Sequence, residues 1–158
     1  RNMSSAASDV YKRQLQSSVS AGAKIACGGE TSQSGLYLSP AVLIDVSYEN
    51  SIMQEEIFGP ILPVVKVKNL EESIDYVNKN EKPLALYLFS NKSFVHEKVL
   101  QNTSSGGMVI NDCVIHHMNP NLPFGGVNNS GVGSYHGKFG FDAFSHQKAV
   151  LKLSLIHI

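Results

Sequence analysis

The side chains best suited to chemistry lie in one short segment, QEEIFGPILP, at residues 54–63. Two carboxylates, Glu55 and Glu56, stand beside the aromatic ring of Phe58, and a Gly-Pro pair follows at once. Glycine adopts backbone angles that other residues avoid, while proline fixes φ and lacks an N–H donor, so this pair ends regular structure. The segment therefore predicts a rigid turn that presents one carboxylate and one ring.

The elements predicted around this turn alternate between strands and helices. Asn69, three residues before Glu72, is typical of a helix start, and Leu70, Ile74 and Val77 give that helix one apolar face. Strands are predicted at residues 24–27, 61–67, 84–89 and 108–110, with two short strands or one kinked strand at 36–46. The tail of a helix is predicted at 15–21, and further helices are predicted at 92–101 and 134–144.

The order of these elements predicts the fold class. After the turn the pattern is β-α-β-α-β, and strands joined by helical crossovers form parallel sheets with helices on their faces. We therefore predict an α/β fold. Residues 111–133 have little periodicity but much Gly, Asn and Pro, which predicts a long ordered loop of the kind that often carries function.

The composition excludes several classes of partner. The chain has 158 residues, 42% of them hydrophobic, and thirteen acidic side chains balance thirteen basic ones. Without a Lys/Arg run, no nucleic-acid partner is predicted, and no apolar run reaches the roughly 18 residues that a membrane helix needs. Two cysteines are too few for a disulfide framework and favour a reducing compartment.

A second block of motifs indicates the family. LPFGGVNNSGVG at residues 122–133 is followed by YHGK at 135–138 and FSHQ at 144–147. Together with EEIFGP, these motifs resemble the aldehyde dehydrogenase superfamily, in particular its class 3 branch of fatty and aromatic aldehyde dehydrogenases. The resemblance covers about residues 15–152, in family order. It implies the parallel-sheet portion of that catalytic domain and a C-terminal oligomerisation strand, Gln147 to Leu151, through which a homodimer forms.

The resemblance implies roles for four residues. Glu56 matches the glutamate that hydrogen-bonds the ribose next to the nicotinamide of NAD or NADP, and an ionised carboxylate accepts two hydroxyl protons at about 1.5–3 kcal/mol each. Phe58 would pack near the nicotinamide. Asn111 and Phe124 match positions that line the aldehyde pocket. On the residues alone the alternatives are a solvated turn carboxylate, a core phenylalanine and a strand-end asparagine cap.

Other candidate residues receive weaker or no assignments. Two interpretations of Glu55 stay open, a structural role and a role in the site. The glycines at 125–137 do not spell a phosphate-binding loop, and we expect them to allow positive φ and close backbone approach around Phe124. His116 and His117 are adjacent, and adjacent strand residues face opposite sides, so no metal is assigned.

The cysteines do not match the family nucleophile. That nucleophile stands in a GQxC-type context upstream of EEIFGP, and neither Cys27 nor Cys113 has this context, so both are predicted to be buried small hydrophobic residues. In the family a cysteine thiolate attacks the aldehyde, hydride passes to NAD(P)⁺, and water activated by a second glutamate hydrolyses the thioester. The nucleophile, that general base and the coenzyme-binding domain are expected before residue 15, so no catalytic residue is predicted in this chain.

We therefore predict a C-terminal fragment of an NAD(P)-dependent aldehyde dehydrogenase, inactive alone, whose parent oxidises medium- or long-chain aliphatic or aromatic aldehydes to carboxylic acids. The alternative is a non-catalytic dimerisation module derived from the same family. Residues 1–14 and 153–158 resemble translated sequencing-adapter sequence and are set apart from the family segment at 15–152; an apolar strand is the alternative for 153–158. The expected location is the cytoplasm or, for the full-length parent, the cytosolic face of a membrane.

Overall fold

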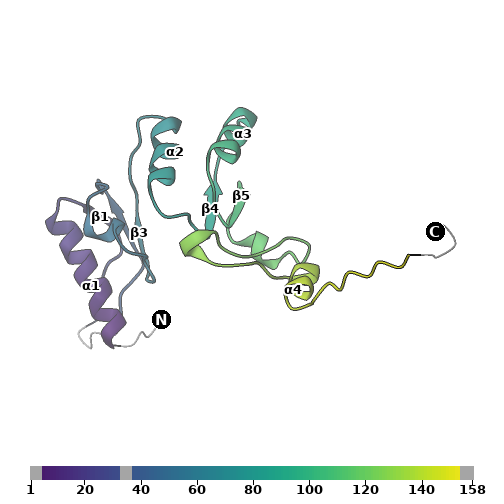
Figure 1. The fold of residues 1–158 in the computed structure, drawn as a ribbon. Coiled ribbons are helices and arrows are strands. Elements are labelled where there is room, and N and C mark those ends of the chain that lie inside the picture. Colours follow the sequence, from purple (N-terminus) through teal and green to yellow (C-terminus); the bar gives the residue numbers. More distant parts are fainter. Residues whose placement is uncertain (1–4, 33–36, 154–158) are drawn as a thin grey trace. The chain divides into compact units, whose positions relative to one another are not determined.

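The computed structural model describes residues 5–32 and 37–153, which form two compact units, Arg1–Lys68 and Asn69–Ile158 (Figure 1). The first unit contains the helix α1 (Ser5–Ser20), the strands β1 (Lys24–Cys27), β2 (Ala41–Ile44) and β3 (Ile61–Pro63), and the one-turn 3₁₀ helix η1 (Ser51–Met53). The strand order is β1-β2-β3. β1 is antiparallel to β2, with Lys24 opposite Ile44, and β3 is parallel to β2, with Ala41 opposite Ile61.

The core of the first unit lies between α1 and this sheet. Alternation along β2 buries Ala41 and Leu43, and Leu43 is fully buried at 0% exposure. Tyr11 and Leu15, one helical turn apart, bury the facing side of α1. The whole cluster comprises Tyr11, Leu15, Ala23, Leu38, Ala41, Leu43, Val46, Ile52 and Ile61.

The second unit has a smaller sheet. It contains α2 (Leu70–Lys79), β4 (Ala85–Leu88), α3 (Ser93–Asn102), β5 (Gly107–Ile110), the 3₁₀ helices η2 (Ile115–Met118) and η3 (Asn128–Ser130), and α4 (Gly137–Ala143). β4 and β5 are parallel, with Ala85 opposite Gly107, and Figure 1 shows α3 beside them. The buried hydrophobic side chains described here are Ile74, Val99 and Val109.

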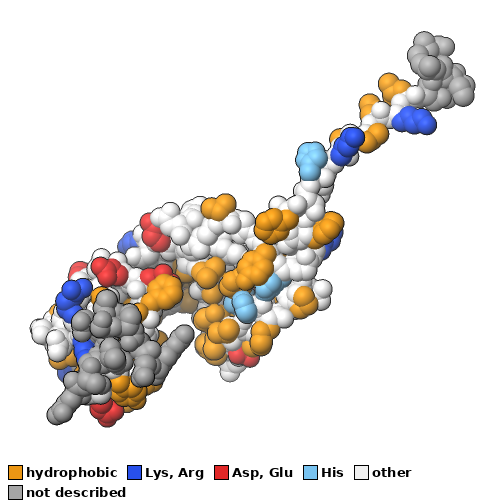
Figure 2. Space-filling view, turned by 90° about the horizontal axis from the view of Figure 1, so that it is seen from below, with side chains coloured by type: hydrophobic (Ala, Val, Ile, Leu, Met, Phe, Trp, Pro, Cys, Tyr) orange, Lys and Arg blue, Asp and Glu red, His pale blue; other side chains and the backbone are white. Residues whose placement is uncertain are grey.

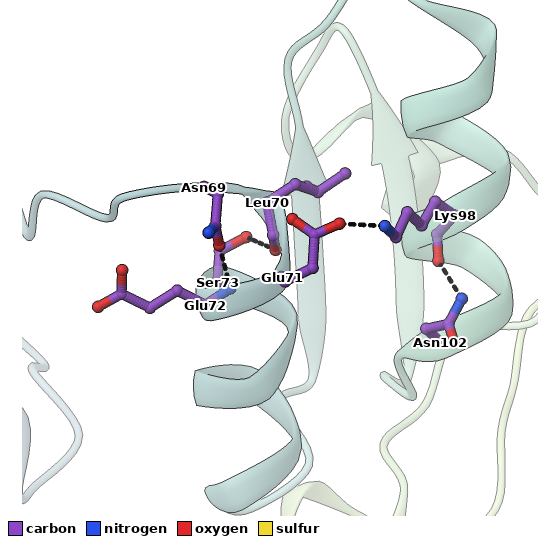
Figure 3. A network of polar contacts seen from close by, with 7 residues as sticks. All are labelled: Asn69, Leu70, Glu71, Glu72, Ser73, Lys98 and Asn102. Atoms are coloured by element: carbon purple, nitrogen blue, oxygen red, sulfur yellow. Dashed lines mark hydrogen bonds and ion pairs between the residues drawn. The ribbon is translucent and has the colours of Figure 1, made fainter.

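The start of α2 confirms the capping motif predicted from the sequence. The Asn69 side-chain oxygen accepts a hydrogen bond from the Glu72 backbone N–H at 2.9 Å (Figure 3). The preceding residue, Glu71, forms a hydrogen-bonded ion pair with Lys98 of α3. The hydrogen bond and the charge of Lys98 lower the pKa of the Glu71 carboxyl. The cap therefore fixes where α2 begins, and the ion pair ties it to α3.

The structure confirms the α/β class but corrects the predicted sheet. β3 pairs with β2, and β4 pairs with β5, so the segments after the turn do not form one continuous β-α-β-α-β sheet. The periodicity of a strand shows which face is apolar but not which strand is its neighbour. Here Ile61 joins the buried residues of β2 in one core, which places β3 beside β2.

Both ends of the chain differ from the predicted elements. α1 runs from Ser5 to Ser20, so residue 15 onward is the tail of a helix as predicted, but residues 5–14, for which no element was predicted, form the rest of that helix. Residues 145–153 are extended, and Figure 1 shows them leading away from α4; they form no strand pairing with the other described residues. A strand at Gln147 to Leu151 that pairs with a second chain stays a prediction. The residues predicted to be adapter-like include 1–4 and 154–158, which lie outside the described residues.

Candidate nicotinamide-side turn and aldehyde-pocket loop

The turn at residues 54–60 is anchored by the short helix that precedes it. Asn50 caps η1 by accepting a hydrogen bond from the Ile52 N–H at 3.4 Å, and it donates from its amide to the Ser18 carbonyl of α1 at 3.3 Å. The Ile52 side chain is 1% exposed and lies in the core. The chain therefore enters the EEIFGP segment from a fixed position.

α1 also supports the turn directly. The Tyr11 hydroxyl donates a hydrogen bond to the Phe58 carbonyl, and the Gln14 amide donates to the Glu55 carboxylate at 3.5 Å. A Cβ on Gly59 would lie 2.7 Å from the Tyr11 ring, so glycine is required for this close approach. Glu55 is thus engaged within the fold, which favours its structural interpretation.

The two side chains predicted to meet the coenzyme point into solvent. Phe58 is 77% exposed, which excludes the alternative that its ring packs in the core of this chain. Glu56 is exposed and makes no hydrogen bond or ion pair among residues 5–32 and 37–153. The backbone of the turn is fixed by contacts with α1, whereas the side chains of Glu56 and Phe58 are exposed. This combination suits contact with a ligand. The structure does not test the contact itself, and the roles of Glu56 and Phe58 stay predictions.

Asn111 lies at the end of β5, where its side chain closes the parallel pair. Its side-chain oxygen accepts a hydrogen bond from the Ser90 N–H at 2.8 Å, and its own N–H donates to the Leu88 carbonyl at 2.7 Å. The backbone has φ 63°, a left-handed angle that asparagine tolerates better than most residues. This is the strand-end cap that the sequence left open, and a contact of Asn111 with an aldehyde stays a prediction.

Phe124 lies at the centre of a cluster of rings in the second unit, which we call the ring cluster. Its backbone pairs with Tyr135 through two hydrogen bonds of 3.0 Å, which brings the FGG and YHG motifs together. The rings around Phe124 belong to His116, His117, Tyr135 and His136. Tyr135 and His136 belong to the YHGK motif, and His116 and His117 were considered only as metal ligands, so no role around Phe124 was predicted for them.

The glycines near Phe124 behave as predicted. A Cβ on Gly125 would lie 2.1 Å from the Gly133 carbonyl oxygen, and a Cβ on Gly126 would lie 2.2 Å from Ser130. Gly133 has φ +74°. A pocket of about 370 Å³ opens at this loop, lined by Phe124, Gly125, Gly126, Gly131, Val132, Gly133, Ser134, Tyr135, Ala143 and Phe144. The bare backbone of this loop therefore shapes the pocket next to Phe124.

Other predictions for single residues change. Cys27 and Cys113 are exposed, not buried, because β1 is an edge strand exposed along its length and Cys113 lies on the exposed loop after β5. His116 and His117 lie on η2 and not on a strand, so the strand argument for separating them is wrong. Within residues 5–32 and 37–153, no three His, Cys, Asp or Glu side chains are placed to hold a metal ion.

Comparison with known proteins decides the family. The sequence profile described as "Aldehyde dehydrogenase family" matches residues 2–150. The chain belongs to the aldehyde dehydrogenase family. The match includes residues 2–14, although the origin of that stretch is not tested by it. Glu56, Phe58, Asn111 and Phe124 all lie within the matched range.

Relatives within the aldehyde dehydrogenase family confirm the class 3 resemblance. Rat "Aldehyde dehydrogenase, dimeric NADP-preferring" is 52% identical over 134 residues, which cover 85% of this chain and 30% of that protein. Human "Aldehyde dehydrogenase family 3 member B1" is 55% identical over 128 residues, or 81% of this chain and 27% of that protein. The chain thus spans about a third or less of the length of these relatives.

A solved aldehyde dehydrogenase confirms the fold. The structure described as "Substrate bound state of Staphylococcus Aureus AldH" superposes with a TM-score of 0.86 at 39% identity, covering 98% of this chain and 34% of that one. The small parallel and mixed sheets therefore belong to an aldehyde dehydrogenase fold. Among the described residues, no helix combines the length and apolar character needed to cross a membrane.

Proposed function

We propose that this chain is the C-terminal part of an NAD(P)-dependent aldehyde dehydrogenase that oxidises medium- or long-chain aliphatic or aromatic aldehydes to carboxylic acids. One observation carries the proposal. The EEIFGP turn, in a chain of this family, holds the Glu56 carboxylate and a Phe58 ring that is 77% exposed outside the core. The names of two relatives, an NADP-preferring enzyme from rat and an "NAD-dependent aldehyde dehydrogenase from Sinorhizobium meliloti", support either coenzyme.

The residues of the turn fit the nicotinamide half of such a coenzyme. The exposed Glu56 carboxylate has acceptor capacity for two ribose hydroxyls, and the exposed Phe58 ring offers an apolar face. The bound coenzyme would supply the acceptor for the hydride. The role of the turn is to orient: Tyr11 and Gly59 fix the backbone at Phe58, so its ring and the neighbouring carboxylate project from a constrained bend.

Asn111 and Phe124 are proposed to line the aldehyde pocket. Their support is the pocket at the glycine loop beside Phe124 and the fixed position of Asn111 at the end of β5. We further propose a homodimer through about Gln147 to Leu151, because this segment is extended and apolar side chains such as Val150 are exposed on it, 78% in that case. A cytoplasmic location, or one on the cytosolic face of a membrane, is part of the same proposal.

The catalytic nucleophile is proposed to come from outside these 158 residues, which makes the isolated chain inactive. Neither cysteine has the sequence context of the family nucleophile. Purified chain, incubated with NAD⁺ or NADP⁺ and a medium-chain or aromatic aldehyde, should give no NAD(P)H absorbance. Turnover that disappears in Cys113→Ser or Cys27→Ser would contradict this and place the nucleophile here.

The test of the coenzyme role uses the complete enzyme that contains this segment. Glu56→Gln should lower the hydride-transfer rate about 10- to 100-fold, the equivalent of about 1.5–3 kcal/mol, because the charge-assisted hydrogen bonds are lost. The fold should be unchanged, since the Glu56 side chain makes no described contact that stabilises it. The control is Glu49→Gln, an exposed carboxylate of the same unit outside the turn. Equal kinetics in the two variants would remove Glu56 from the site.

A further inference from the structure

The rings around Phe124 combine one apolar face with polar edges. The His136 ring is stacked on Phe124, with centroids 5.9 Å apart and 22° between planes, while His117 meets Phe124 edge to face at 5.0 Å and 87°. His117 and His136 are themselves 5.5 Å apart. Figure 2 shows histidine side chains among hydrophobic ones on the face seen there. The side of Phe124 that meets these histidines is therefore lined by aromatic rings that carry ring nitrogens.

This arrangement is held by a strained backbone. His136 has φ 93° and Val114, at the start of η2, has φ 67°, both in a region that side chains with a Cβ rarely adopt. The adjacent Gly137 has φ +46°, and a Cβ there would lie 2.5 Å from the Pro120 carbonyl oxygen. Gly107 of β5 leaves room for the His116 ring, whose nearest atoms lie 2.8 Å from where a Cβ would stand. The backbone at His136 and the ring of His116 are thus held by their surroundings.

Several ring nitrogens of these histidines have no hydrogen-bond partner among the described residues. Both ring nitrogens of His116 and the Nδ1 of His136 are buried without a hydrogen bond among the described residues. His117 is exposed, and residues 5–32 and 37–153 offer it no hydrogen bond. Every neutral imidazole keeps one N–H donor and one acceptor. A purely apolar substrate that covered His117 would shield its N–H from water without accepting a hydrogen bond from it, which costs free energy.

We propose that His117 is a specificity-determining residue, and that the surface formed by the His117 ring beside Phe124 recognises aromatic aldehydes carrying a carboxylate or another hydrogen-bond acceptor away from the aldehyde carbon. The substrate ring would lie against the aromatic surface at Phe124, and the His117 N–H would donate to the distal acceptor. This inference rests on the proposed oxidation of aldehydes by the complete enzyme, and it narrows the proposed substrate class.

The experiment compares three substrates in the complete enzyme: para-carboxybenzaldehyde, para-methylbenzaldehyde and benzaldehyde. The quantity measured is the ratio of kcat/KM for the carboxylated substrate to kcat/KM for the methylated one. In His117→Phe, which keeps a flat ring but removes the N–H, this ratio should fall about tenfold or more, mainly through KM for the carboxylated substrate. His117→Gln, which keeps an N–H donor, should retain most of the ratio.

The outcomes separate this inference from the proposed function. If no aldehyde is oxidised by the intact enzyme, the proposed function fails. If benzaldehyde is oxidised but the ratio is the same in the wild type, His117→Phe and His117→Gln, the assignment of His117 is overturned. His146→Phe, an exposed histidine on the extended segment and outside the ring cluster, is the matched control and should leave the ratio unchanged. A fall that is equal for all three substrates would also contradict the inference, because it indicates a general structural role.

Discussion

The turn at residues 54–60 rests on a packed core, whereas the loop around Phe124 depends on the shape of its backbone. Beneath the turn, Ile52 is 1% exposed and Leu43 is 0% exposed. Around Phe124 the close contacts are between backbone atoms, as at Gly125 and Gly133, or between rings that are partly exposed. Both regions are proposed to place side chains for a ligand, and the comparison shows two ways in which this fold fixes its backbone there, by burial and by steric restriction.

The comparison is tested most strongly by creating a cavity under the turn. Ile52→Ala should lower the free energy of unfolding by about 4 kcal/mol, while Ile74→Ala, the same change at the 8% exposed position in α2, should cost about 2 kcal/mol. The reason is that Ile52 belongs to the larger buried cluster. Urea denaturation followed by circular dichroism measures both values. Equal losses would show that the second unit is as well packed as the first.

The next largest effect is expected at the glycine loop. Gly125→Ala should destabilise the chain by about 3 kcal/mol, because the new Cβ would lie 2.1 Å from the backbone oxygen of Gly133. Gly133→Ala is the matched control: its Cβ meets nothing within 4 Å, and only its φ of +74° is unfavourable, at about 1 kcal/mol. Near-ultraviolet circular dichroism reports whether the Phe124 and Tyr135 rings keep their packing. A larger loss in the control would mean that φ, and not backbone contact, shapes the loop.

The smallest expected effect concerns charge, and it should be alike in both units. Hydrogen bonding and charge from Lys24, and then Lys66, hold the pKa of Asp45 below its ordinary value, as Lys98 does for Glu71. A carboxyl with a lowered folded pKa stabilises the fold above its unfolded pKa, and this stabilisation is lost as pH falls through the folded value. Asp45→Asn and Glu71→Gln should each flatten the acid side of the stability curve slightly, as measured by urea titrations at falling pH. A strong effect of one alone would reveal an electrostatic difference between the units.

Local signals in the sequence predicted the elements well where one residue decides the structure. Asn69 caps α2 as predicted, and residues 54–60, which end in the Gly-Pro pair, form no helix or strand between η1 and β3. The pairing of β3 with β2 was not predictable, because a strand's own pattern does not name its neighbour. The exposure of Cys27 was missed for a related reason: residue type predicts burial only when the position of the strand in its sheet is known.

The candidate site was predictable as motifs but not as contacts. Glu56 and Phe58 follow from EEIFGP, and the structure adds that α1 supports them through Tyr11. The ring cluster depends on the pairing of Phe124 with Tyr135 across a loop, and on a positive φ at His136. Neither feature has a period or a composition that a linear sequence displays. Tertiary contact therefore decides which of the motif residues surround Phe124.

The capping role of Asn111 determines what this side chain has left to offer a ligand. Its amide oxygen already receives the Ser90 N–H, at 2.8 Å, to close the end of the parallel pair. The amide hydrogens of its NH₂ group make no hydrogen bond to the described residues. Asn111 therefore has two N–H donors and one remaining acceptor site for an incoming molecule, and its donors suit a carbonyl oxygen. The residue that closes the end of β5 would in this way offer its N–H donors to a neighbouring molecule.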